Sequence, residues 1–286
     1  MKGANHMAIK ILTDSTSDIM PQEARERGLA LVPLRVAFGE ELFRDNMDIT
    51  HQEFYAKLAQ SEALPTTSQP TPDDFLPFFE AARDNGDQLI CILLSGGLSG
   101  TVQSATIAKD IADYDGIYVV DSCQAVIGLR LLVDLACVLR EEGKSAPEIV
   151  AELESARERV RLYAMVDTLE YLHKGGRLSS ASAVAGTLLK VKPLISLSST
   201  LSVVGKAMGS KAALKQLMAY LGDELKNDPR LPLYLGYTCT EDNCQQFQAM
   251  VGEKYPDLTT EIHSVGAVIG AHVGPGATTF AYLEQA

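Results

Sequence analysis

The chain has no tryptophan and only five cysteines among its 286 residues. The cysteine number is odd, and no two cysteines have the Cys-x-x-Cys spacing of zinc ribbons and redox motifs. A disulfide framework and a cysteine zinc site are therefore not expected. We expect buried thiols in a reducing compartment instead. The five residues are Cys91, Cys123, Cys137, Cys239 and Cys244.

Positive charge and long apolar runs are also scarce. The chain has 25 lysines and arginines against 37 aspartates and glutamates, a formal net charge of −12. This balance argues against nucleic acid and against an anionic membrane surface as partners. No apolar run approaches the roughly 20 residues of a transmembrane helix, and Met1–Met7 lack the apolar region of a signal peptide. We expect a cytoplasmic protein whose contact with membranes is at most transient.

Common nucleotide and metal motifs are absent. Gly143-Lys144-Ser145 lacks the upstream glycine of a P-loop, and no Gly-x-Gly-x-x-Gly follows a strand-like run. The sequence contains neither His-Glu-x-x-His nor the Gly-x-Ser-x-Gly elbow of α/β-hydrolases. None of the five histidines is paired at metal-ligand spacing. We therefore expect no metal ion and no cofactor, and we assign no catalytic residue.

What the sequence does contain is an alternation of strand-like and helix-like segments over its first 160 residues. Strands are expected at residues 9–13, 29–38, 88–94 and 116–120. Helices are expected after the capping residues Thr50, Thr71 and Ser145, among others. The apolar run at residues 88–94 is typical of a strand buried on both faces of a parallel sheet. This pattern predicts a doubly wound α/β domain.

The second half has a different texture. Leu194–Val204 is predicted to form a hairpin that turns around Ser198–Thr200, and strands and helices follow in mixed order. We therefore expect an α/β protein of two domains, an N-terminal doubly wound α/β domain at residues 8–160 and a smaller α+β domain at residues 161–286. A ligand is expected between them, because clefts between domains are common binding sites.

The loop Ser95-Gly-Gly-Leu-Ser-Gly-Thr101 is the strongest local signal, because it joins a buried strand to a helix. Backbone N–H groups at the start of a helix favour an anion, and glycines let a ligand approach the backbone. Ser95, Ser99 and Thr101 add hydroxyl groups. A simpler interpretation is a tight turn in which Ser99 or Thr101 only caps the helix. The loop alone favours neither interpretation.

Four other segments carry polar side chains in unusual density. Each also has a plain structural interpretation, namely turn chemistry, hydrogen bonds to the loop's own backbone, a partnered histidine or a solvated basic turn. The segments are Asp14–Asp18, Leu64–Thr71, His173–Arg177 and Gly266–Gly276, which contains His272.

Taken together and in order, these segments resemble the DegV family, the bacterial fatty-acid-binding proteins. The resemblance covers about residues 9–284, and each of its motifs alone is weak. They are Asp14–Asp18, Thr67-Ser-Gln-Pro70, Leu98-Ser-Gly-Thr101, Asp121-Ser122, Lys174-Gly-Gly-Arg177, Lys192–Ile195 and Ala271-His-x-Gly-x-Gly276.

The resemblance implies one long-chain fatty acid between two domains, with its carboxylate held by Thr67, Ser99 and His272. Supporting positions are Ser68, Ser95, Gly97, Gly100 and Thr101. It also implies a partner, a separate ATP-dependent fatty acid kinase that phosphorylates the bound carboxylate, for which Arg177 is a natural contact. On this reading the chain presents the substrate and is not itself the enzyme.

The sequence departs from the family pattern at several positions. Gly96 stands where a serine is common, and Val126 and Arg130 stand where further serines and a Gly-x-Gly are common. Met208 replaces an arginine that often precedes Gly209. These changes leave the three carboxylate positions intact and affect the expected tail tunnel and the docking of the kinase.

The chemistry of a fatty acid fits these residues. At roughly 0.8 kcal/mol per buried methylene, about 14 methylenes contribute on the order of 11 kcal/mol before ordering costs. The hydroxyls of Thr67 and Ser99 replace water around the carboxylate without a full countercharge, and His272 is expected to titrate near neutral pH. The alternative is a hydrolase or acyltransferase with Ser99 or Ser95 as nucleophile and His272 as base.

Overall fold

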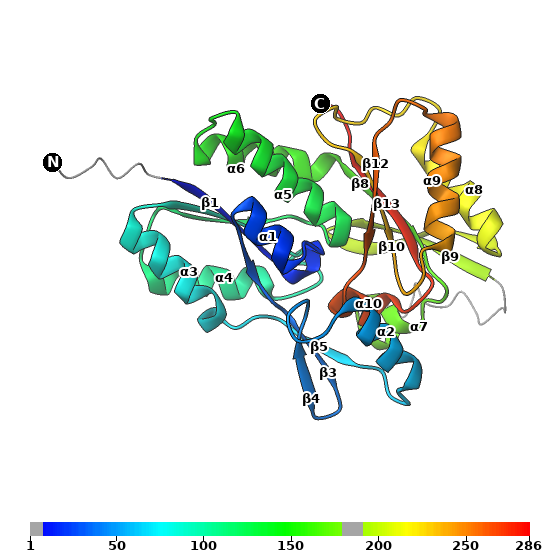
Figure 1. Ribbon diagram of the computed structural model, residues 1–286, viewed down its shortest axis with the longest axis horizontal. Coiled ribbons are helices and arrows are strands. Elements are labelled where there is room, and N and C mark those ends of the chain that lie inside the picture. The colour runs from blue at the N-terminus through cyan, green and yellow to red at the C-terminus, as the bar shows by residue number, and fades with distance from the viewer. Residues whose placement is uncertain (1–7, 179–190) are drawn as a thin grey trace.

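The computed structural model describes residues 8–178 and 191–286. Residues 1–7 and 179–190 lie outside the described residues. Figure 1 shows two large sheets and a small one below them, from which a hairpin projects.

The first sheet is parallel and has four strands. Its order is β2 (Leu29–Val32), β1 (Ile9–Asp14), β6 (Gln88–Leu93) and β7 (Ile117–Asp121). The helices associated with it are α1 (Pro21–Arg27), α3 (Pro72–Asn85), α4 (Thr101–Ala112), α5 (Val126–Glu141) and α6 (Ala146–Ala156). The alternation of strand and helix and the parallel register confirm the predicted doubly wound α/β architecture.

A small antiparallel sheet lies beside the first one, and the sequence did not predict it. It consists of β4 (Glu41–Arg44), β3 (Arg35–Phe38) and β5 (Thr66–Ser68), in that order. The single strand predicted at residues 29–38 is wrong: it divides at Pro33 into β2 and β3, which belong to different sheets. Proline has no N–H for the ladder, so the chain leaves the first sheet there.

The second large sheet is mixed and has six strands. Its order is β10 (Thr200–Met208), β9 (Val191–Ser198), β8 (Val160–Met165), β13 (Thr278–Leu283), β11 (Leu233–Tyr237) and β12 (Thr260–Ser264). The predicted hairpin is confirmed as β9–β10, with Ser199 at a φ of 62° in its turn. The α+β organisation predicted for the second half is therefore confirmed.

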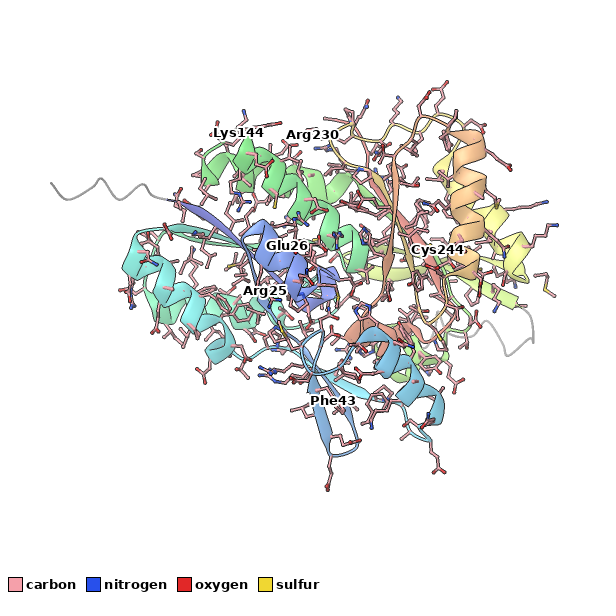
Figure 2. The ribbon with its side chains drawn as sticks, viewed as in Figure 1. Arg25, Glu26, Phe43, Lys144, Arg230 and Cys244 are labelled. Carbon is pink, nitrogen blue, oxygen red and sulfur yellow. The ribbon has the colours of Figure 1, made fainter. Side chains whose placement is uncertain are left out.

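The two faces of the six-stranded sheet bury different helices. Along β13, Phe280 and Tyr282 point to α8 (Ser210–Leu221) and α9 (Asp242–Lys254), and Ala281 and Leu283 point to α5. Figure 2 labels Cys244 on α9, where its thiol is fully buried against the sheet. This alternation places α5 between the two large sheets.

Helix α5 joins the two halves into one continuous core. Its apolar side chains cluster with Ile11 and Ile90 of the first sheet and with Leu162 and Ala281 of the second. The boundary between residues 160 and 161 stays a prediction, although β8, the first strand of the second large sheet, begins at Val160. The two halves therefore meet over an apolar surface that also surrounds the candidate site described below.

Short helices complete the chain, and capping explains where several of them begin. The helix α2 (His51–Gln60) starts after Thr50, whose hydroxyl accepts the N–H of Glu53 while the Glu53 carboxylate accepts the N–H of Thr50. The others are η1 (Ser15–Ser17), η2 (Arg157–Arg159), α7 (Glu170–Lys174) and α10 (Ala267–Val273). The helix α10 was not predicted, because its segment is rich in glycine.

Two expectations from composition can be compared with the described residues. No helix in residues 8–178 and 191–286 is both long and apolar enough to cross a membrane. All five cysteines are free, and Cys91, Cys137 and Cys244 are buried as expected. Cys123 is half-buried and Cys239 is exposed, so the expectation of buried thiols is wrong for Cys239. Cys239 follows strand β11 in a left-handed turn, with a φ of 68°.

Candidate functional site

An apolar cavity of about 280 Å³ lies where the two halves meet. One water takes up roughly 30 Å³ in the liquid, so the cavity has room for a small ligand. Its walls come from loops that follow strands of the first sheet, from β5 of the small sheet, from the α5-facing side of the six-stranded sheet and from α10. Apolar side chains dominate the walls, among them Leu34, Leu94, Leu162, Ile195, Leu197 and Val268.

The helix α10 provides one side of the cavity along its length. Val268, Ile269, His272 and Val273 all line the cavity, at the spacing that places residues on one helix face. The apolar residues of this face lead toward His272, near the last turn. The cavity therefore changes from apolar to polar along α10.

The polar part of the cavity brings together residues that are far apart in the sequence. Thr67 lies on β5, and its Oγ1 is 2.7 Å from Nε2 of His272, a distance typical of a hydrogen bond. Ser99 lines the same cavity from the loop before α4. All three residues predicted to hold a carboxylate thus line one cavity, with Ser68 and Gln69 exposed beside them.

The hydroxyl of Ser99 is oriented by its own loop. Its Oγ lies 2.9 Å from Oγ1 of Thr101, the buried first residue of α4, and its backbone N–H donates to the carbonyl of Ser95. Gly100 is the N-cap residue of α4 and has no side chain to cap the helix. Thr101 therefore orients Ser99, as a supporting residue would.

Three other positions of this loop, Ser95, Gly97 and Gly100, contact protein rather than the cavity. The hydroxyl of Ser95 donates to the carbonyl of Ser199 in the β9–β10 turn, at 2.6 Å. A Cβ on Gly97 would lie 2.5 Å from the same carbonyl oxygen, and a Cβ on Gly100 would lie 2.1 Å from Oε1 of Gln69. Gly97 is needed because the backbone of the β9–β10 turn approaches it, whereas at Gly100 the close atoms belong to the end of the exposed Gln69 side chain. Through Ser95 and Gly97 the loop connects the two halves of the chain.

In this structure His272 is neutral near pH 7. Burial, together with the positive charge of Arg177, lowers the pKa of His272 to about 4. The expectation that it titrates near neutral pH is therefore wrong for this state, because water is excluded from the imidazole. Among the described residues, Nδ1 of His272 has no hydrogen-bond partner, and a Cβ on Gly175 would lie 2.2 Å from that atom.

Arg177 also lines the cavity, which the sequence did not predict. Its Nε donates to the carbonyl of Leu98 at 3.2 Å, and its Nη1 donates to the carbonyl of Gly175 at 2.8 Å. These bonds place a positive charge beside the hydroxyl and imidazole groups. The only sequence signal was its position in the basic turn, where it was assigned to a partner.

Three of the positions that depart from the family pattern, Val126, Arg130 and Met208, have separate surroundings. Val126 lines the cavity at the start of α5, and its φ of 47° is a strained backbone conformation for a β-branched residue. Arg130 is buried outside this cavity and is ion-paired with Glu23. Met208, at the end of β10, is 69% exposed. Of the three, only Val126 can act directly on the cavity.

The polar groups of the site are uncharged hydroxyl and imidazole groups, and the nearby positive charge is that of Arg177. In residues 8–178 and 191–286, no cluster of histidine, cysteine, aspartate or glutamate side chains is arranged to hold a metal ion. The hydroxyl of Ser95 donates to Ser199, and Ser99 lies against Thr101. The hydroxyl next to His272 is that of Thr67. A serine–histidine pair of the kind a hydrolase uses is therefore not formed by Ser95 or Ser99 in this structure.

The chain is similar to known proteins over nearly its whole length. Residues 8–285 match the family model described as "Uncharacterised protein, DegV family". The chain is 35% identical to Protein DegV of Bacillus subtilis over 274 residues, covering 95% of this chain and 97% of that protein. It is 34% identical to a DegV domain-containing protein of Caldanaerobacter subterraneus subsp. tengcongensis, covering 97% and 99%.

Solved structures show the same fold. A DegV family protein from Thermus thermophilus, described by its fatty acid binding, has a TM-score of 0.88 and 34% identity, covering 98% of this chain and 100% of that one. The DegV protein of Bacillus subtilis, described as a fatty acid binding protein, has a TM-score of 0.85 and 32% identity with the same coverage.

Proposed function

This chain belongs to the DegV family, and we propose that it binds one long-chain fatty acid in the cavity and presents the carboxylate to a separate ATP-dependent fatty acid kinase. One observation carries the proposal. An apolar cavity between the two halves leads to a cluster in which Thr67 and His272 are in hydrogen-bond contact and Ser99 lines the same wall. The two similar structures described as fatty acid binding support the choice of ligand.

The apolar walls supply most of the affinity. Each buried methylene contributes roughly 0.8 kcal/mol, so a long acyl chain outweighs the cost of ordering the ligand. The carboxylate loses its water on entry and needs hydrogen-bond donors in return. The hydroxyls of Thr67 and Ser99 and the Nε2 of His272 are the groups we assign to it.

The neutral donors suit a carboxylate that must react. They hold the anion without neutralising it, whereas a bidentate arginine would bind it more rigidly. In the reaction assigned to the partner, a carboxylate oxygen attacks the γ-phosphorus of ATP, the bond to the bridging oxygen of ADP breaks, and an acyl phosphate forms. The exposed Ser68 and Gln69 beside the cluster leave this end open to solvent.

Arg177 has two tasks in this proposal. Its positive charge attracts the carboxylate into the polar part of the cavity, and its partial exposure makes it available to the kinase. Its bonds to Leu98 and Gly175 hold it beside the ligand rather than on it. Replacing it should therefore impair phosphate transfer more than binding.

Lipid extraction followed by mass spectrometry tests the binding step. Purified protein should carry about one fatty acid per chain, and delipidated protein should take up palmitate or oleate. An empty protein that takes up neither would contradict the proposal. The kinase step is tested by incubating the loaded protein with ATP and the fatty acid kinase of the same organism, and trapping acyl phosphate as a hydroxamate.

The alternative hydrolase has its own signature. The contact between Thr67 and His272 is one that a hydroxyl nucleophile and its base would make. A fluorophosphonate probe that labelled Thr67 or Ser99, together with ester turnover abolished by His272→Ala, would favour that enzyme over the binding protein.

A further inference from the structure

The segment Asp14–Asp18 is a motif that the proposed ligand site does not use. It follows β1 and forms η1, and all five side chains are buried. The carboxylate of Asp14 binds backbone groups around the end of β1. It accepts the N–H of Leu94 at 2.7 Å and that of Thr16 at 2.9 Å. Asp18, at the other end of the motif, points to a different part of the chain.

Asp18 and Asp45 both reach the start of α10. Oδ1 of Asp18 accepts the N–H of Gly266 at 2.9 Å, and Oδ1 of Asp45 accepts the N–H of Ala267 at 3.0 Å. Asp18 is 4% exposed and Asp45 is 1% exposed. Two buried carboxyl groups from the first fifth of the chain thus bind the helix that carries His272.

The start of α10 is closely surrounded, so its position is narrowly defined. A Cβ on Gly266 would lie 2.9 Å from Oδ1 of Asp18 and 3.0 Å from Nε2 of His51. The hydroxyl of Tyr55 on α2 donates to the carbonyl of Val265 at 3.0 Å, just before the helix. Figure 1 shows α10 beside α2 at the foot of the six-stranded sheet.

A small movement at this end would be felt at His272. Ala267 and His272 are five positions apart in the sequence. This spacing corresponds to about 7.5 Å along a helix. Nε2 of His272 and Oγ1 of Thr67 are 2.7 Å apart. A hydrogen bond weakens when the distance between donor and acceptor exceeds about 3.2 Å by a few tenths of an ångström. A tilt of α10 by about 10° would move His272 by more than 1 Å and break this contact.

We propose that Asp18 and Asp45 are positioning residues for the carboxylate site: they hold the first turn of α10 so that His272 stays against Thr67. The inference rests on the proposed function for its ligand readout, but the contact between His272 and Thr67 is independent of any ligand. The carboxyl groups act through the helix and do not touch the fatty acid.

Affinity for an acid and for its alcohol separates positioning from general stability. Palmitate and hexadecanol share the apolar chain, and only palmitate uses the full carboxylate cluster. Asp45→Ala should reduce the preference for palmitate by about tenfold or more, while hexadecanol affinity changes by less than about threefold. Asp45→Asn should keep the preference, because an amide oxygen can still accept the N–H of Ala267.

Two further variants keep the test decisive. Gly266→Ala leaves both carboxyl groups in place and displaces the helix start, so it should lose the same preference even if Asp45→Ala fails to fold. Asp228→Asn is the matched control, because Asp228 is a buried carboxylate that bonds to Arg230 at the opposite end of the six-stranded sheet from α10 (Figure 2). It should lose stability and keep the preference.

The outcomes distinguish this inference from the proposed function. An unchanged preference in Asp45→Ala and Gly266→Ala, or an equal loss in Asp228→Asn, would overturn the positioning role. If the wild-type protein binds no palmitate, the proposed function fails instead. The imidazole ¹⁵N shifts of His272 then decide the inference alone: they should change in Asp45→Ala and Gly266→Ala, and unchanged shifts would refute it.

Discussion

Removing the hydroxyl of Thr67 is the sharpest perturbation of the carboxylate cluster. Thr67→Val has nearly the same shape, and valine suits the central position that Thr67 takes in β5 opposite Val36. The substitution leaves Nε2 of His272, now 2.7 Å from a hydroxyl, facing a methyl group. It therefore changes hydrogen bonding at the site with little change in the strand.

The expected loss follows from the charge of the ligand. A hydrogen bond to a charged group contributes about 1.5–3 kcal/mol, so Thr67→Val should weaken palmitate binding by roughly 10- to 150-fold. Hexadecanol has no charge, and its affinity should fall by about tenfold at most, for a neutral bond worth about 0.5–1.5 kcal/mol. The difference between the two ligands is the quantity that reports on the carboxylate.

Isothermal titration calorimetry on delipidated protein measures both affinities. Thr67→Ser is the control: it restores the hydroxyl and should bind palmitate within about threefold of the wild type. Equal losses for palmitate and hexadecanol in Thr67→Val, or no loss for palmitate, would refute the assignment of Thr67 to the carboxylate.

Three other substitutions test the surroundings of the site. Gly175→Ala places a Cβ 2.2 Å from Nδ1 of His272 and should lower palmitate affinity more than hexadecanol affinity in the same titration; equal effects would argue against His272. Burial raises the pKa of Asp45 to about 7, so its protonated form stabilises the fold, and that contribution is lost as pH rises from about 4 to 7. In urea unfolding, the free energy of unfolding of Asp45→Asn relative to the wild type should therefore rise over that pH range, by roughly 4 kcal/mol at most. A difference that stays constant with pH would contradict the raised pKa of Asp45. Val126→Gly relieves a left-handed φ of 47° and enlarges the cavity, so bulkier or longer acyl chains should bind relatively better in a competition assay; an unchanged ligand profile would exclude Val126 from the tail site.

Much of the architecture could be predicted from local patterns. The run at Leu89–Leu93 is apolar throughout because β6 is central in its sheet and buried on both faces. The helices α2, α3 and α6 begin directly after Thr50, Thr71 and Ser145, since caps act over a few residues. Such signals are local, and sequence shows them directly.

The errors in the fold arise where tertiary contacts decide. The helix α10 was not predicted because the glycines of its segment suggested a loop. A Cβ on Gly270 would lie 2.7 Å from the hydroxyl of Tyr55, and one on Gly274 would lie 2.5 Å from the ring of Tyr171. The spacing of four residues between Gly266, Gly270 and Gly274 was the available signal, because it places small residues along one helix face.

The candidate site depended on resemblance more than on local chemistry. The glycine loop alone favoured a ligand and a plain turn equally, and the structure gives Gly97 and Gly100 structural partners. Thr67 and His272 are 205 positions apart, and no local pattern predicts that such residues meet. Arg177 was missed as a cavity residue for the same reason.

The central claim is that a fatty acid carboxylate lies among Thr67, Ser99 and His272. A crystal structure of the protein with palmitate tests it most directly. We predict a carboxylate oxygen at about 2.5–3.2 Å from Oγ1 of Thr67, Oγ of Ser99 and Nε2 of His272, with the acyl chain along the apolar face of α10. A ligand bound in the opposite direction, or outside this cavity, would contradict the account.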